Sequence, residues 1–95
     1  MDVQILFEAR PETGARYLYI GRVTERNNYC EIRVFSSENI VELYLNGELR
    51  HKQKSSGEFV FCTSLGDYSD VDTLDIVAKT VGEEQLSDEV TVKIR

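Results

Sequence analysis

The sequence predicts an all-β protein built as an antiparallel β-sandwich of six or seven short strands. Apolar and polar residues alternate with a period of two along most of the chain, which is the pattern of strands with one buried face. Turn-forming residues separate these runs about every 8–12 residues. No segment of useful length carries the 3.6-residue period of an amphipathic helix. A closed β-barrel is the alternative architecture.

The chain starts with an apolar run, VQILFEA, over residues 3–9, and Pro11 and Gly14 end this run. We expect residues 1–16 to be a linker, or an entering strand from a preceding domain. The sandwich domain itself is expected over residues 17–95.

The first strand of the sandwich is predicted over residues 17–24 (YLYIGRVT), where Leu18 and Ile20 share one face. Gly21 inside this strand predicts a β-bulge or a close approach of another group to the backbone.

The second strand is predicted over residues 29–35, after a turn at residues 26–28. Its alternation places Cys30, Ile32 and Val34 on the inward face.

The next two strands form the clearest element of the sequence. Apolar residues alternate over residues 40–45 (IVELYL), Asn46-Gly47 follows, and the chain returns through residues 48–54. Asn-Gly between two extended runs predicts a two-residue type I′ turn with Gly47 at positive φ. The return arm is nearly all polar, so we expect an exposed edge strand.

The remaining strands are predicted over residues 58–63, 73–81 and 86–94, with a long polar stretch over residues 64–71. The inward positions should form one core, and the residues expected in it are Ile32, Val34, Val41, Leu43, Leu45, Leu74, Ile76, Val90 and Val92. The chain has no Trp, so the Cys-Trp-Cys pattern of antibody domains is missing. The expectation is therefore an immunoglobulin-like or fibronectin-III-like sandwich.

Composition and charge exclude two classes of partner. The net charge is −6 and the basic residues are scattered, whereas a nucleic-acid-binding face needs clustered Lys and Arg. The closest group, Arg50, Lys52 and Lys54, fits a solvated edge strand. No apolar run approaches the ~20 residues that span a bilayer. The N-terminus also lacks the features of a signal peptide, so we expect neither nucleic acid nor membrane as a partner.

The residues that could be catalytic or bind a metal are better explained as solvated side chains on outward strand positions or in turns. Most of the acids fall on outward or turn positions, so we expect no paired catalytic carboxylates. His51 is the only imidazole and is expected to be solvated, which leaves a Ser or Cys nucleophile without a base. We expect no catalytic residues, no metal and no cofactor.

Two small groups of residues leave alternatives open. The acids of the DYSDVD stretch, Asp67, Asp70 and Asp72, could offer oxygens to Ca²⁺, but they lack the spacing of an EF-hand loop and suit a turn better. Cys30 and Cys62 each lie in a strand pattern and fit small buried hydrophobes, with a disulfide as the alternative.

Tyrosines supply the remaining candidate site. Tyr17, Tyr19 and Tyr44, with Tyr29 and Phe35, fall on outward or ambiguous positions. Such rings could stack on a sugar, pair across strands or dock on a neighbouring domain, and the last two are the commoner roles.

A family resemblance emerges from four of these stretches. They are RVFSS over residues 33–37, VELYLNGE over 41–48, FVF over 59–61 and SDEVTV over 87–92. In this order they resemble the immunoglobulin-like accessory domain that lies C-terminal to the catalytic barrel in β-galactosidase-type glycoside hydrolases of family two. The resemblance runs from about Tyr17 to the end of the chain.

The resemblance implies a non-catalytic accessory domain from a bacterial glycoside hydrolase, either cytoplasmic or secreted. Its partners would be the other domains of the parent enzyme, and carbohydrate is a second possible ligand. The family's catalytic carboxylates belong to its barrel, and nothing in this chain matches that segment. A carbohydrate-binding module and an adhesin-type spacer repeat are the alternative functions.

Overall fold

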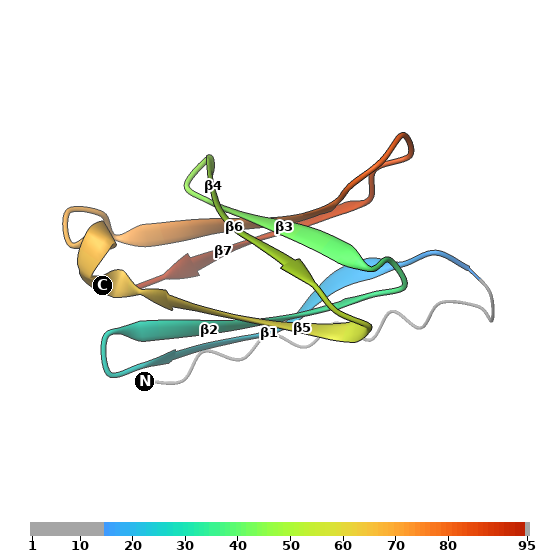
Figure 1. The fold of residues 1–95 in the computed structure, drawn as a ribbon. Coiled ribbons are helices and arrows are strands. Elements are labelled where there is room, and N and C mark those ends of the chain that lie inside the picture. The colour runs from blue at the N-terminus through green and yellow to red at the C-terminus, as the bar shows by residue number, and fades with distance from the viewer. Residues whose placement is uncertain (1–14, 95) are drawn as a thin grey trace.

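The computed structural model describes residues 15–94, which form seven strands and one short helix (Figure 1). The elements in order are β1 (Leu18–Arg26), β2 (Tyr29–Ser36), β3 (Ile40–Leu45), β4 (Glu48–Lys54), β5 (Gly57–Ser64), the 3₁₀-helix η1 (Leu65–Tyr68), β6 (Thr73–Thr80) and β7 (Ser87–Lys93). The linker or entering strand expected over residues 1–16 lies outside the described residues, except for its last two positions.

The strands form two antiparallel sheets that face each other as two layers (Figure 1). One sheet has the order β1-β2-β5 and the other has the order β4-β3-β6-β7. The predicted all-β sandwich is confirmed. The fourth strand pairs with the third, whereas constant-type immunoglobulin domains place it in the opposite sheet.

The core between the sheets contains eight of the nine residues expected there, and Val90 is only partly buried. The buried apolar residues that the expected core did not include are Ile20, Val23, Cys30, Phe59, Phe61, Leu65, Tyr68 and Ala78. The two phenylalanines of β5 supply the largest addition, and their rings stack with centroids 6.5 Å apart.

The predicted irregularity at Gly21 is confirmed as a β-bulge. The register of β1 on β2 shifts between Ile20 and Arg22, so Ile20 and Val23 both face the core although they are three positions apart. The N–H of Ile20 just before the bulge donates to the Asp88 carboxylate of β7 at 2.8 Å. This hydrogen bond joins the two sheets at the β1 edge.

The hairpin between β3 and β4 has the predicted turn, with Asn46 at φ 50° and Gly47 at φ 85°. Asn46 also extends the β3–β6 pairing beyond the last strand residue. Its backbone N–H donates to the carbonyl of Asp75 at 2.9 Å, and its side-chain oxygen accepts the N–H of Asp75 at 2.8 Å.

β4 is an edge strand as expected, but one face of it is not solvated. Leu43 pairs with His51 and Tyr44 pairs with Leu49, so Arg50 is the extra residue of a bulge. The bulge places His51 and Gln53 opposite the buried Leu43 and Val41, at the mouth between the sheets. The expectation of a solvated His51 is therefore wrong.

The side chain of Gln53, on β4, forms hydrogen bonds with the free backbone edge of β5 in the opposite sheet. Its amide Nε2 donates to the carbonyl of Val60 at 3.3 Å, and the N–H of Val60 donates to its Oε1 at 3.2 Å. These two bonds satisfy groups of Val60 that point away from β2, where the ladder pairs Val60 with Arg33.

The polar stretch after β5 contains η1 and contributes to the core. Ser64 caps this helix by accepting the N–H of Gly66 at 3.3 Å. Residues three apart eclipse each other in a 3₁₀-helix, so Leu65 and Tyr68 both turn inward and are buried.

Candidate functional site

Three aromatic side chains lie in a row on the outer face of the three-stranded sheet, which we call the aromatic row: Tyr17, Tyr19 and Phe35. The ring centroids of Tyr17 and Tyr19 are 6.0 Å apart and their planes are tilted by 35°. Tyr19 stacks on Phe35 across the β1–β2 pair, with centroids 5.3 Å apart and planes within 24°. The rings therefore pack on one another and are half-buried.

The ring of Phe35 also covers the backbone of Gly21. A Cβ atom placed on Gly21 would lie 2.5 Å from Cε2 and 2.7 Å from Cδ2 of Phe35. The missing side chain of Gly21 thus leaves room for the Phe35 ring against the sheet.

The structure separates Tyr44 from the other candidate tyrosines. Tyr44 lies on the outer face of the four-stranded sheet, between Leu49 of β4 and Val77 of β6. The ammonium group of Lys79 lies 4.8 Å from its ring centroid. Tyr17, Tyr19 and Tyr44 therefore do not form one platform.

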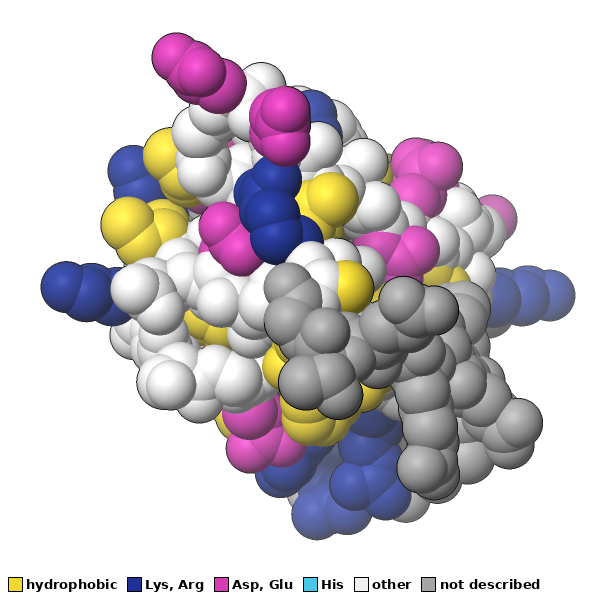
Figure 2. Space-filling model, turned by 90° about the vertical axis from the view of Figure 1, so that its right-hand side faces the viewer, with side chains coloured by type: hydrophobic (Ala, Val, Ile, Leu, Met, Phe, Trp, Pro, Cys, Tyr) yellow, Lys and Arg dark blue, Asp and Glu magenta, His cyan; other side chains and the backbone are white. Residues whose placement is uncertain are grey.

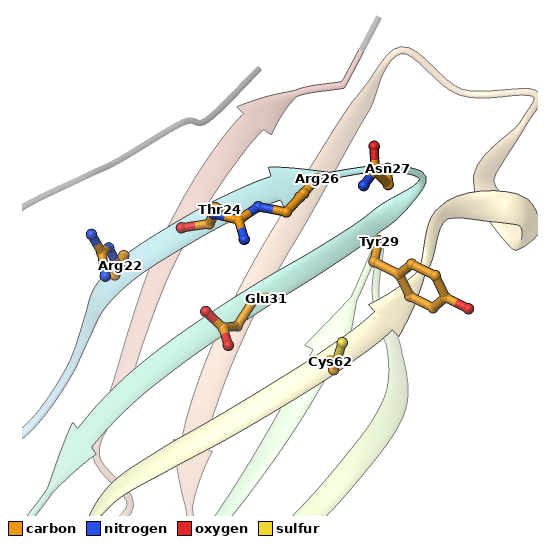
Figure 3. A pocket seen from close by; sticks show the side chains of 7 residues that line it. All are labelled: Arg22, Thr24, Arg26, Asn27, Tyr29, Glu31 and Cys62. Carbon is orange, nitrogen blue, oxygen red and sulfur yellow. The ribbon is translucent and has the colours of Figure 1, made fainter.

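Next to the aromatic row, a hollow of about 480 Å³ lies on the same outer face, at the β1–β2 turn (Figure 3). We call it the arginine hollow. Strand β1 contributes Arg22, Thr24 and Arg26, and the turn contributes Asn27. Tyr29 and Glu31 of β2 and Cys62 of β5 complete the lining.

The strand register explains how these residues meet. Thr24 is opposite Glu31, Arg26 is opposite Tyr29, and Glu31 is opposite Cys62. In Figure 3 the side chain of Arg26 extends along β1 toward Thr24, and the Glu31 carboxylate lies between the positions of Arg22 and Arg26. The Tyr29 ring stands at the outer end of the hollow and is 55% exposed.

The two arginines of the hollow differ from the other arginines in residues 15–94. Arg16, Arg33 and Arg50 each have two carboxylates within 4.0 Å. Within the same part of the chain, Arg22 and Arg26 have no such carboxylate. Sequence reasoning did not single out these two residues, although their alternation with Thr24 along one strand already placed all three on one face.

The two cysteines are free and lie on opposite faces of the same sheet. Cys30 is buried, as expected for a small hydrophobe, whereas Cys62 is exposed, against that expectation. Burial raises the pKa of the Cys30 thiol to about 11, and Glu25 and Cys62 add smaller contributions. Cys30 is therefore a poor nucleophile.

His51 is a half-buried ring without a catalytic arrangement around it. The ring lies 5.8 Å from that of Phe61, and within residues 15–94 its buried Nε2 atom has no hydrogen-bond partner. Burial lowers the pKa of His51 below its usual 6.5, and the charge of Arg50 lowers it further. The neutral ring is thus the form that suits the mouth of the sandwich.

The acids considered for calcium do not converge. Asp67 accepts a hydrogen bond from Arg50 at 2.9 Å, and Asp70 and Asp72 are exposed. Residues 15–94 contain no group of three or more His, Cys, Asp and Glu side chains arranged to hold a metal ion.

Charges on the end of the molecule shown in Figure 2 are mixed, with acidic and basic side chains interspersed. The described part of the chain also contains no helix with the length and apolar character needed to cross a membrane.

No family model matches the sequence of this chain, and no curated protein matches it significantly.

Proposed function

We propose that this chain is a non-catalytic accessory domain that packs against a neighbouring domain of the same protein through the outer face of its three-stranded sheet. The observation that carries the proposal is the aromatic row, because three contacting rings lie on a face that no second sheet of residues 15–94 covers. Aromatic side chains are among the residues enriched in protein interfaces, and the three rings of this row lie together on one face.

Ring geometry favours docking over sugar binding. A sugar-binding platform needs rings that offer open faces side by side, whereas Tyr19 and Phe35 stack face on face and Tyr17 is tilted against them. An accessory domain is therefore the better candidate, and a carbohydrate-binding module is the alternative.

We further propose that the parent protein is a bacterial glycoside hydrolase of the β-galactosidase type. The support is the resemblance in the segments that form the end of β2, most of β3 with its turn, the centre of β5 and most of β7. In such a protein the chemistry belongs to the barrel, and this domain would support it by packing.

The experiment starts from the full-length gene product that contains this chain, identified by mass spectrometry of the native protein. We expect that product to hydrolyse chromogenic galactosides or glucuronides, and the isolated chain to give only the buffer rate. In the full-length protein, Tyr17→Ser should lower the unfolding temperature of the catalytic domain. The matched control is Tyr44→Ser, which removes a ring from the other sheet.

Three results would contradict these proposals. Hydrolysis by the isolated chain would refute the non-catalytic role. A full-length product without a catalytic barrel would refute the parent assignment and favour a spacer repeat. Saturable NMR shifts at Tyr17 and Tyr19 on titration with galactose-containing oligosaccharides would favour the binding module.

A further inference from the structure

We propose that the arginine hollow binds an extended acidic peptide segment in which two carboxylates are four residues apart. This inference goes beyond the packing role proposed above and does not rest on it, because it concerns other residues of the sheet. The ligand would approach Arg22 and Arg26 from solvent and lie along strand β1 (Figure 3).

The first argument for an acidic ligand is that two guanidinium groups have no carboxylate partner within residues 15–94. Acids outnumber bases by 17 to 11 in this chain, and every other arginine within residues 15–94 has two carboxylate neighbours. Arg22 and Arg26 are exposed and have none within that range. A guanidinium presents a planar fork of donors that matches a carboxylate, so an incoming carboxylate supplies the missing partner.

Spacing is the argument for a peptide in extended form. Arg22 and Arg26 are four residues apart on one face of β1, with Thr24 between them, which is about 13 Å at the rise of a strand. An extended peptide repeats its side chains at the same interval. Carboxylates at its first and fifth positions would therefore meet the two arginines together.

Glu31 gives the hollow a selectivity of its own. It is opposite Thr24 in the register, so its carboxylate faces the middle of the bound segment. Among residues 15–94, Glu31 has one cationic neighbour, Arg33, at 3.5 Å, and Arg33 also contacts Glu58. An acidic residue at the third position of the peptide would be repelled, whereas a neutral or basic residue would be accepted.

The middle of the hollow and its end at the β1–β2 turn supply neutral contacts. The hydroxyl of Thr24 and the amide of Asn27 can hydrogen-bond a peptide backbone, and the exposed ring of Tyr29 offers apolar area. Tyr and Arg are also the side chains that most often dominate binding energy in protein interfaces.

Binding is tested by fluorescence anisotropy with labelled seven-residue peptides and the whole chain. The probe peptide has Glu at positions 2 and 6 and Lys at position 4, and the control peptide has the same composition with the two Glu residues adjacent. We expect the probe to bind more tightly than the control, and the affinity to fall as salt is raised. Arg22→Gln and Arg26→Gln should each weaken binding about fivefold.

Two matched variants complete the test. Lys93→Gln, which removes an exposed cation from the other sheet, should leave probe binding unchanged. Glu31→Gln should raise the affinity for a third peptide that has Glu at position 4 in place of Lys. Far-UV circular dichroism and the urea midpoint confirm that each variant is folded.

Several outcomes would overturn the proposal. These are equal binding of probe and control peptides, an equal loss in Lys93→Gln, and no loss in Arg22→Gln and Arg26→Gln. Tighter binding of a heparin oligosaccharide than of the probe would also overturn it, and would assign the arginines to a sulfated glycan. None of these results bears on packing by the aromatic row, which is tested in the full-length protein.

Discussion

Gly21 and Phe35 should be strongly coupled in their effect on stability. Alanine at position 21 would place a Cβ 2.5 Å from the Phe35 ring, and that ring cannot move freely because it stacks on Tyr19 at 5.3 Å. Forcing an extra carbon into a packed site costs about 1–3 kcal/mol. We therefore expect Gly21→Ala to lower the free energy of unfolding by that amount.

The sign should reverse when the ring is removed. The positive-φ glycines of the described chain are Gly47, Gly57 and Gly82, so the backbone at Gly21 accepts an L-residue. Alanine in a strand is more stable than glycine by about 0.5–1 kcal/mol. In a Phe35→Ala background, Gly21→Ala should therefore stabilise the protein slightly, and the coupling energy should be about 1.5–4 kcal/mol.

Urea unfolding of the parent, the two single variants and the double variant measures this coupling directly. The midpoints are compared after checking that the m-value is the same in all four proteins. Tyr19→Ala is the additional control, because it frees the Phe35 ring and should reduce the cost of Gly21→Ala. If the cost of Gly21→Ala is the same within about 0.5 kcal/mol with and without the ring, the packing described for this bulge is wrong.

Three further predictions follow from the core and from the buried titratable groups. Leu43→Ala should lower the free energy of unfolding in urea by about 2–5 kcal/mol, because Leu43 is fully buried. The exposed control Lys54→Ala should change it by less than about 0.5 kcal/mol. Similar costs for the two variants would mean that β3 faces the other way. Iodoacetamide should alkylate Cys62 in the native protein and reach Cys30 only on unfolding, and mass spectrometry showing two rapid modifications would contradict the burial of Cys30. The folded-state pKa of His51 is lowered, so the stability that the neutral ring contributes is complete above pH 6.5 and is lost as the pH falls from 6.5 through the folded-state pKa. Between pH 7.5 and 5.0, the free energy of unfolding measured in urea should therefore fall more in the parent than in His51→Gln.

Local sequence signals predicted the fold well where one strand face is apolar throughout. The alternation in β2 and β3 identified their buried residues, and the Asn46-Gly47 pair identified the turn with its positive φ angles. The same signals did not predict which residues of β4 face inward. The bulge at Arg50 changes the alternation, and no apolar residue marks that change. The helix η1 was also missed, since its buried residues are spaced three apart within a polar stretch.

The candidate site was only partly predictable because it depends on which strands are neighbours. Period-two alternation can place Tyr19 and Tyr44 on outward faces, but it cannot say that those faces belong to different sheets. The arginine hollow needs the register of β1 on β2 and of β2 on β5, which brings Thr24, Glu31 and Cys62 into one line. Pairing of this kind is set by tertiary packing, so a single strand sequence does not contain it.

The side-chain amide of Gln53 makes the protection of the β5 edge sensitive to deamidation. It holds the backbone of Val60 as a neighbouring strand would, so the edge of β5 is closed to a strand from another molecule at that point. Spontaneous hydrolysis of the amide would turn the residue into glutamate, which has no N–H to give to the Val60 carbonyl. The Val60 carbonyl would then lose its donor and become available to another strand, while the Val60 N–H could still donate to the new carboxylate.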